Sequence, residues 1–459
     1  MVPSVLLAAC ATDAVVSSEP PAVEPTETGH GPDTGEPAAP GPALRFQGER
    51  PRNVLVISID TLARDVVGRY GGGDATPFLD GLAEEGFVLD EHASCSAWTL
   101  PGVICAITGS DPLDLGLVPH VGSDASQVAG LPPDTPTLAT HLQDEGLQTA
   151  LVSANGYLGS FVNTSTGYAE YVDVLAARGD AVTAEVLQLI DAPRLDPGQP
   201  WLLHVHYLDP HAPYDPPAEY LAGFEAFGEF PWDLTTDEGL YEAGLAWGSL
   251  PEDEQARVRA AVEFLYARQV RWLDDQVAAL WAALDERNML DDTLVLVWSD
   301  HGEQRWQHGS RGHGGSLYVE ENGAIAFFWA KSLIPGRWDE LTTHKDLAPT
   351  VLEALGDDVP DEMTGAVVGT ASPDRPVFAT VWPMGDAPPI QYVRVGNDEL
   401  LYEWSGRKRV YDLAADPEEQ AATYDATDPV VLALWSELLP RVEAVEALFP
   451  ELTAEDAGP

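Results

Sequence analysis

The sequence has few basic residues. Its 459 residues include 23 Lys and Arg against 75 Asp and Glu, which gives a formal net charge of −52. A surface with this charge repels the phosphate backbone of nucleic acids and the anionic head groups of lipids. We therefore expect no nucleic acid partner.

Cysteines and long apolar stretches are also scarce. The three cysteines are too few to predict the disulfide framework of a small secreted domain. After the first ten residues, no stretch is long and apolar enough to cross a bilayer as a helix. A chain of 459 residues with 45% hydrophobic content can bury one large core and a smaller one, so we expect two folded parts.

The amino terminus has a short apolar run that ends in Leu7-Ala8-Ala9-Cys10 and resembles the lipidation box of bacterial lipoproteins. No basic residue precedes this run, and the run is short for a secretory signal. Either translation starts further upstream, which we favour, or the match is accidental. In the first case, residues 1–10 are a signal segment and Cys10 carries a lipid, the only membrane contact of a periplasmic or extracellular protein of the bacterial envelope.

Residues 11–50 are rich in Pro, Glu, Thr, Gly and Ala and contain few large apolar side chains. Such a segment cannot bury enough apolar surface to fold, so it is predicted to be a disordered tether.

Two uncharged runs with many β-branched residues, Asn53–Ile59 and Thr293–Ser299, predict buried parallel strands. Each run is followed by an acid: Asp60 after the first, and Asp300 with His301 after the second. The carboxyl ends of parallel strands meet at one edge of a sheet, where α/β proteins bind ligands. We therefore expect the two carboxylates to lie within a few ångströms of a shared cation.

His308 and His313 follow in a glycine-rich loop and add imidazole nitrogens, which are ligands for metals such as zinc. The alternative is structural: Asp300 caps a helix and the histidines lie around it on the surface.

Thr99 is followed by Pro101 and an apolar run with helical character. This pattern predicts that the Thr99 hydroxyl lies at or near the amino terminus of a helix, where the dipole favours a developing anion. The alternative is that Thr99 is only the N-cap of that helix, with Pro101 in its first turn.

Other segments are predicted as scaffold. Strands are expected at Thr149–Ser153 and at Leu202–Tyr207, whose end presents Asp209 and His211, while His204 and His206 are expected to be structural. Residues 218–250 are expected to be irregular. The remaining expectations are helices at Thr76–Gly86, Val258–Leu284 and Pro429–Phe449 and a small antiparallel sheet of Pro376–Val381, Gln391–Val395, Glu399–Trp404 and Arg409–Leu413.

Five segments in order resemble the successive blocks of the sulfatase family in the alkaline phosphatase superfamily. They are SIDTLARDVVGRYGG, AWTLP with AITGS, HVHYLDPHAPYDPP, WSDHGEQRWQHGSRGHGGSLY and HKDLAPTVLEALG, and they span Asn53–Gly356. A further segment, VYDLAADPEEQ, resembles the carboxy-terminal signature of the family.

This resemblance implies an α/β fold of the alkaline phosphatase type. A mostly parallel sheet flanked by helices would form a catalytic domain at residues 51–355, and a small antiparallel sheet with a helix would form a subdomain at residues 356–459.

The resemblance also implies the roles of six residues. Thr99 falls at the position of the nucleophile, and His211 and His313 match histidines that face the transferred group or the leaving oxygen. Asp60, Asp300 and His301 match the ligands of one divalent ion, which would be Mn, Zn, Ca or Mg. Because His301 replaces the asparagine common in calcium sulfatases, Mn or Zn is slightly favoured.

Several positions depart from the family pattern. Thr61 replaces a second acid, Val103 stands where an arginine is usual, and residues 153–157 lack a lysine- and histidine-bearing motif. Thr99 itself replaces the cysteine that most sulfatases oxidise to formylglycine, and it has no second hydroxyl. A site with fewer cationic groups favours a singly charged ester over a dianion.

The sequence therefore predicts a metal-dependent hydrolase that cleaves a sulfuric ester, or a closely related monoanionic ester, through Thr99. Its partner would be a small-molecule, glycan-linked or lipid-linked anionic ester. One alternative is a phosphonate monoester or phosphodiester hydrolase, or a phosphoryl-group transferase, on the same fold. A second alternative is a catalytically silent surface-binding protein.

Overall fold

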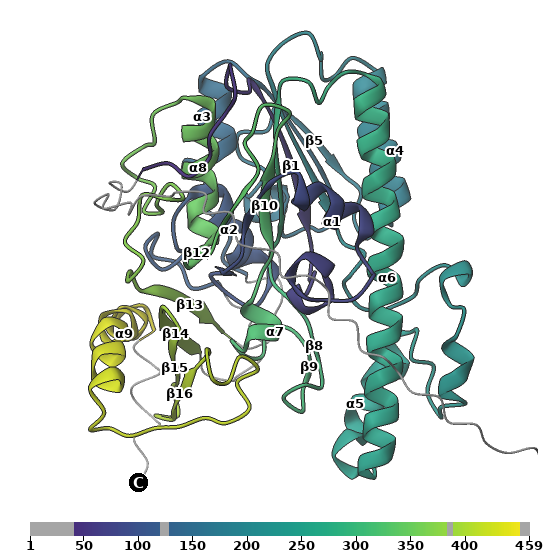
Figure 1. Cartoon of the computed structure of the whole chain (residues 1–459), viewed down its shortest axis with the longest axis vertical. Coiled ribbons are helices and arrows are strands. Elements are labelled where there is room, and N and C mark those ends of the chain that lie inside the picture. The colour runs from purple at the N-terminus through teal and green to yellow at the C-terminus, as the bar shows by residue number, and fades with distance from the viewer. Residues whose placement is uncertain (1–40, 120–127, 383–388, 450–459) are drawn as a thin grey trace, which may run out of the picture. The chain divides into compact units, whose positions relative to one another are not determined.

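The computed structural model describes residues 41–119, 128–382 and 389–449, which belong to one compact unit (Figure 1). The expectations for Cys10 and for the tether up to residue 40 lie outside these residues. Residues 43–47 of the predicted tether pack against the folded unit: Leu44 is buried, and Phe46 forms a β-bridge with Leu333.

The main sheet of the described residues has eight strands and is mostly parallel, as expected, with β10 antiparallel to both of its neighbours. In order across the sheet, the strands are β11 (Gly336–Trp338), β2 (Phe87–Leu89), β10 (Ala326–Trp329), β7 (Thr293–Ser299), β1 (Asn53–Ile59), β6 (Trp201–Tyr207), β4 (Gln148–Ser153) and β5 (Glu170–Asp173). The two strands predicted to carry the acids, β1 and β7, are direct neighbours.

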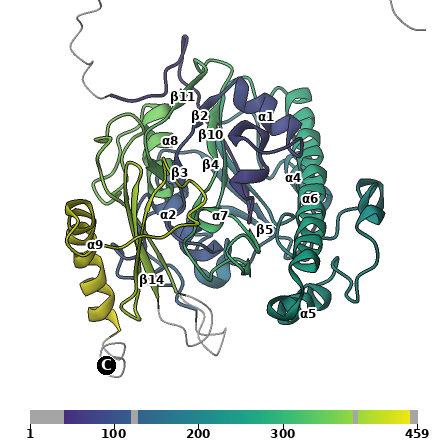
Figure 2. The same ribbon diagram turned by 60° about the horizontal axis from the view of Figure 1, so that its bottom comes forward.

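Helices cover both faces of this sheet (Figure 2). Successive residues of a strand point to opposite faces, so Leu55 and Ile57 of β1 pack in one core and Val54 and Val56 in the other. The first core includes α1 (Pro77–Glu84), α4 (Gly179–Asp191) and α6 (Glu252–Glu286), and the second includes α2 (Thr99–Thr108), α3 (Leu138–Asp144) and α8 (Leu347–Leu355).

The expectation of irregular structure at residues 218–250 is wrong in part. Helix α5 (Asp237–Ala246) forms there because Thr236 Oγ1 accepts a hydrogen bond from Gly239 N and caps the helix. Leu240 and Ala243 then bury one face of the helix in the core.

The carboxy-terminal sheet matches the expectation closely. Strands β13 (Val377–Val381), β14 (Ile390–Val395), β15 (Asp398–Glu403) and β16 (Lys408–Asp412) form an antiparallel meander, and α9 (Pro429–Leu448) packs on it through Val431, Leu434 and Leu438. Shorter elements lie outside both sheets. Strand β8 (Gln304–Arg305) pairs with β9 (Arg311–Gly312), α7 (Val319–Asn322) lies between β9 and β10 in the sequence, and β12 (Thr342–Thr343) pairs with β3 (His92–Ala93). Within the described residues, no helix has both the length and the apolar character needed to cross a membrane.

Candidate active site

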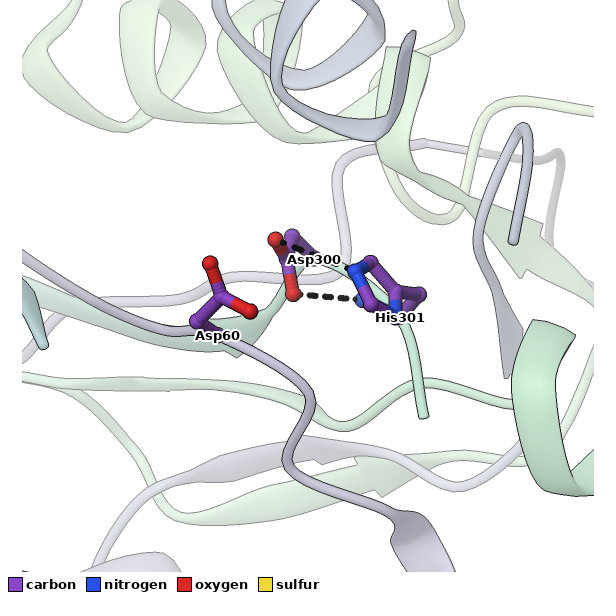
Figure 3. Close-up of side chains that lie close together, drawn as sticks. All are labelled: Asp60, Asp300 and His301. Atoms are coloured by element: carbon purple, nitrogen blue, oxygen red, sulfur yellow. Dashed lines mark hydrogen bonds and ion pairs between the residues drawn. The ribbon is translucent and has the colours of Figure 1, made fainter. Parts of the chain in front are cut away.

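Asp60, Asp300 and His301 come together at the carboxyl ends of two adjacent strands. Strands β1 and β7 pair in parallel with Ile59 opposite Ser299, so the residues that follow lie side by side. All three side chains are fully buried, and each offers one ligand atom within 4.8 Å of the others (Figure 3). Asp300 Oδ1 accepts hydrogen bonds from the backbone N–H groups of Thr61 and His301. No helix begins at Asp300 and His301 is buried, so the structural alternative, a helix cap with surface histidines, is wrong for Asp300 and His301.

The free atoms of this group fit a divalent cation. Asp60 Oδ1, Asp300 Oδ2 and His301 Nε2 are buried and have no hydrogen-bond partner. His301 Nδ1 lies 2.8 Å from the Gly302 carbonyl oxygen, which accepts a hydrogen bond from the Nδ1–H group. The lone pair of Nε2 is therefore available for a metal ion. Burial lowers the pKa of His301 to about 3, so the ring is neutral, as a metal ligand must be.

The two carboxylates also require a compensating charge. Burial and the charge of Asp60 raise the pKa of Asp300 well above its ordinary value. Burial opposes the ionisation of Asp60 as well, but His206 and His211 outweigh it and hold the pKa of Asp60 below its ordinary value. Two carboxylates and one imidazole are a donor set that suits Mn or Zn.

Thr99 is the first residue of α2, and its side chain is turned towards the acids. Thr99 Oγ1 donates a hydrogen bond to Asp60 Oδ2 at 3.4 Å, and the residue is buried. The N-cap of α2 is Trp98, and no side chain caps the helix. The interpretation of Thr99 as only an N-cap is therefore wrong.

Asn155 is a site residue that sequence reasoning missed. It follows β4 by two residues, and its Nδ2 donates to Asp60 Oδ2 at 2.6 Å and to Thr99 Oγ1 at 3.4 Å. The sequence offered one signal: Asn155 lies just after a predicted strand, in the segment that replaces a cationic motif.

A row of polar side chains, buried except for the partly buried Tyr168, runs beneath the site from Tyr168 to Asp60. Tyr168 Oη lies 2.8 Å from His204 Nδ1, His204 Nε2 lies 2.8 Å from Ser58 Oγ, and Ser58 Oγ lies 2.7 Å from His206 Nδ1. His206 Nε2 is then 3.4 Å from Asp60 Oδ2. His204 and His206, expected to be structural, therefore form a row that ends at a candidate ligand.

His211 and His313 lie beside this group. The centre of the His313 ring is 5.0 Å from that of His211 and 4.5 Å from that of His301. His313 Nδ1 is 3.0 Å from Oε2 of Glu303, a buried residue that sequence reasoning missed although it follows His301 by two positions. Burial lowers the pKa of His313, but Glu303 raises it more, to about 8.

Three residues considered from the sequence lie away from the site or have other partners. His308 joins Glu320 and Glu419 in a separate group. Asp209 accepts a hydrogen bond from Gly179 N at the start of α4. Cys95 forms a disulfide with Cys105 of α2, a bond that the cysteine count alone did not predict.

The chain is similar to known proteins both in sequence and in fold. A model of the Sulfatase family matches residues 52–357. Arylsulfatase from Clostridium perfringens is 25% identical over 251 residues, which cover 49% of this chain and 50% of that protein, so the chain spans half the length of this relative.

Two solved structures show the same fold. BT4656, solved in complex with its substrate D-glucosamine-2-N,6-O-disulfate, superposes with a TM-score of 0.64 at 17% identity, covering 90% of this chain and 100% of that one. The phosphonate monoester hydrolase SpPMH from Silicibacter pomeroyi superposes with a TM-score of 0.65 at 19% identity, covering 86% and 95%.

Proposed function

Because the chain belongs to the sulfatase family of ester hydrolases, we propose that it is a metal-dependent hydrolase that cleaves a sulfuric ester with Thr99 as the nucleophile. One observation carries the proposal: the Thr99 hydroxyl lies 3.4 Å from Asp60, in a buried group whose ligand atoms lie within 4.8 Å of one another. A nucleophile beside a cation site is the arrangement that this chemistry requires.

Asp60, Asp300 and His301 would hold the ion through their unpartnered atoms. The bound ion would supply positive charge that lowers the pKa of the Thr99 hydroxyl, so that Oγ1 would lose its proton to water and attack the ester as an alkoxide. Asn155 Nδ2, within 3.4 Å of Thr99 Oγ1, keeps this oxygen in place and stabilises its negative charge.

In the first step, Thr99 Oγ1 forms a bond to sulfur while the bond between sulfur and the alcohol oxygen breaks. His313, whose Nδ1 is held by Glu303, donates a proton to the departing alcohol oxygen. In the second step, a water molecule cleaves the Thr99 sulfate ester, which releases sulfate and restores the hydroxyl. Threonine needs this water because it lacks the second hydroxyl through which a formylglycine hydrate expels sulfate.

A phosphonate monoester or phosphodiester hydrolase, or a phosphoryl-group transferase, is the second candidate. The single hydroxyl of Thr99 favours it, as does Val103, which is fully buried in α2 and brings no charge to the site. The structural similarity to SpPMH agrees with this candidate, and the similarity to BT4656, which acts on a sulfated sugar, agrees with a glycan sulfate as substrate.

Substitution of Thr99 tests the nucleophile. We expect Thr99→Ala to lower kcat by more than about 10³-fold on every active compound in a panel of aryl sulfates, phosphodiesters and phosphonate monoesters. Thr99→Ser keeps a hydroxyl and should keep measurable turnover. Thr108→Ala is the matched control, because Thr108 lies on the same helix but bonds to the Ile104 carbonyl oxygen.

Metal content, measured by mass spectrometry, should be the same in Thr99→Ala and the natural protein. Full turnover by Thr99→Ala would exclude Thr99 as the nucleophile. The panel also decides between sulfur and phosphorus as the reacting atom. Protein stripped of metal should regain activity with Mn or Zn, and no activity under any of these conditions would favour the silent surface-binding protein.

A further inference from the structure

A second group of potential ligands lies outside the candidate active site. His308, Glu320 and Glu419 each offer one ligand atom, and these atoms lie within 4.8 Å of one another. The three residues come from separate segments: the turn between β8 and β9, helix α7, and the chain after β16. Glu419 reaches α7, since its Oε2 accepts a hydrogen bond from Val319 N at 2.5 Å. The group therefore joins the catalytic part of the chain to the carboxy-terminal sheet, which Figure 1 shows near α7.

The ligand atoms of this group have no hydrogen-bond partners. His308 Nε2 and Glu320 Oε2 form an ion pair with each other but have no other partner, and Glu419 Oε1 accepts no hydrogen bond, although Glu419 is only 2% exposed. A buried carboxylate oxygen that accepts no hydrogen bond destabilises the folded protein. His308 Nε2 and Glu320 Oε2 are 3.1 Å apart, an ion-pair distance that also lets both atoms bind one ion after a small adjustment.

The three side chains are held in place before any ligand binds. The His308 ring stacks on Tyr318 with ring centres 3.8 Å apart and planes at 6°. Oε2 of Glu419 accepts the hydrogen bond from Val319 N, whereas Oε1 accepts none. Glu419 also has a φ of +51°, an unfavourable backbone conformation for glutamate that often marks a functional position.

The basic group beside these carboxylates is His308 itself: burial lowers its pKa, but Glu320 and Glu419 raise it more. Burial and the adjacent carboxyl of Glu399 raise the pKa of Glu419 well above its ordinary value, and Glu399 is itself 4% exposed. Two arginines of the neighbouring strands have other partners, Arg394 with Glu91 and Arg409 with Glu403. The group therefore has two acids against one base.

We propose that His308 Nε2, Glu320 Oε2 and Glu419 Oε1 bind a second divalent transition-metal ion. One imidazole with two carboxylates suits Zn or Mn better than Ca or Mg, which prefer oxygen ligands alone. A cavity of about 600 Å³, lined by Glu320, Glu399 and Glu418 among others, lies next to the group and provides a path for the ion. The ion ties the loop that carries His301 and His313 to the carboxy-terminal sheet.

The proposal is independent of the proposed function, because it concerns a different set of ligands. Its test uses the full chain with Asp300→Asn, which weakens the first site. After removal of metal by a chelator, Zn and Mn are titrated by calorimetry, and the unfolding temperature is measured with and without the metal. We expect Asp300→Asn to bind close to one ion per chain and to unfold at a higher temperature when that ion is present.

Addition of Glu419→Gln or His308→Ala to Asp300→Asn should weaken this binding by at least about tenfold and abolish the metal-dependent rise in unfolding temperature. Glu419→Gln keeps the shape of the side chain, and circular dichroism checks that each variant folds. Glu418→Gln is the matched control, because Glu418 is the adjacent acid but is absent from the group. Visible absorption of bound Co should show nitrogen and oxygen ligands in Asp300→Asn and lose this signal with His308→Ala.

Two results would overturn the proposal. One is equal metal binding with and without Glu419→Gln. The other is no binding at all by Asp300→Asn, which would mean that the group is satisfied by protons and by the ion pair of His308 with Glu320.

Discussion

Asp209 lies at the carboxyl end of β6, next to the strand that carries Asp60, yet it supports a helix. Its Oδ1 accepts the hydrogen bond of Gly179 N at the start of α4, while Oδ2 is buried without a partner. Burial raises the pKa of Asp209 from its ordinary value of 3.8 to about 7. A strand-end acid is therefore not sufficient evidence for a ligand.

Asp209 should make stability depend on pH. Between pH 3.8 and about 7, the folded protein keeps a proton that the unfolded chain has lost, so the contribution of Asp209 to stability falls as pH rises. Asp209→Asn cannot titrate, so its free energy of unfolding should rise by a few kcal/mol relative to the natural protein across this interval. Urea unfolding at several pH values measures the difference.

Asp180→Asn is the matched control, because Asp180 is an exposed acid in the first turn of the same helix. Parallel curves of stability against pH for Asp209→Asn and the natural protein would contradict the prediction.

Single residues of the site differed in how far the sequence could predict them. Asp60 and Asp300 were predictable because each follows a recognisable buried strand and the two strands are parallel neighbours. Asn155 and Glu303 were not, because their roles depend on which loops meet above the sheet. The position of Asn155 after a predicted strand was a signal, but it does not show that the amide contacts Asp60 and Thr99.

At the scale of elements, helix α2 lies close to the end of β7 at Gly102. A Cβ atom on Gly102 would lie 2.7 Å from the Asp300 carbonyl oxygen, closer than van der Waals contact allows. Because glycine has no side chain, α2 can lie close to Asp300 here, and Thr99, one helical turn earlier, can approach Asp60.

Gly102→Ala should separate α2 from the end of β7. We expect a loss of stability of about 1–3 kcal/mol and a fall in kcat of about 10²-fold, because the nucleophile moves relative to the metal ligands. Gly81→Ala in α1 is the control, since nothing lies within 4 Å of a Cβ there, and it should stabilise by about 0.5–1 kcal/mol. Thermal unfolding and initial rates measure both effects. Natural activity in Gly102→Ala would show that the contact does not position Thr99.

Elements with strong periodic patterns were predicted well. The buried strands and the meander β13 to β16 were expected within a few residues, because burial on one or both faces fixes their patterns. The long helix α6 was expected too, but it begins at Glu252, six residues before the expected start at Val258. Helix α5 was missed because the segment around it, residues 218–250, is acidic and rich in aromatics, and because the core contact that stabilises the helix depends on the fold around it.

At the scale of the whole molecule, the charge of −52 must be tolerated by the fold. Carboxylates at this density repel one another, and the 23 basic residues can neutralise only a minority of the 75 acids. Much of the surface therefore remains without a counter-charge.

Salt should consequently stabilise the protein. Between 0.01 M and 1 M NaCl the Debye length falls from about 30 Å to about 3 Å, so repulsion between carboxylates weakens while contacting ion pairs lose less. We expect the unfolding temperature, measured by calorimetry, to rise over this range. An equal rise with KCl would identify screening as the cause, whereas a fall with either salt would show that attraction between opposite charges dominates.

The row from Tyr168 to Asp60 has a further consequence, which concerns the placement of hydrogens. Burial lowers the pKa of His204 to about 3 and raises that of Tyr168, so the imidazole has one proton and the phenol keeps its own. The direction of the row is fixed at its other end, because the pKa of Asp60 lies below its ordinary value and an ionised carboxylate can only accept. His206 Nε2 therefore carries the proton that faces Asp60, and His206 Nδ1 accepts from the Ser58 hydroxyl. Ser58 Oγ then accepts from His204 Nε2–H, and His204 Nδ1 accepts from Tyr168, so Asp60 sets the tautomers of the row and His206 is a donor rather than a metal ligand.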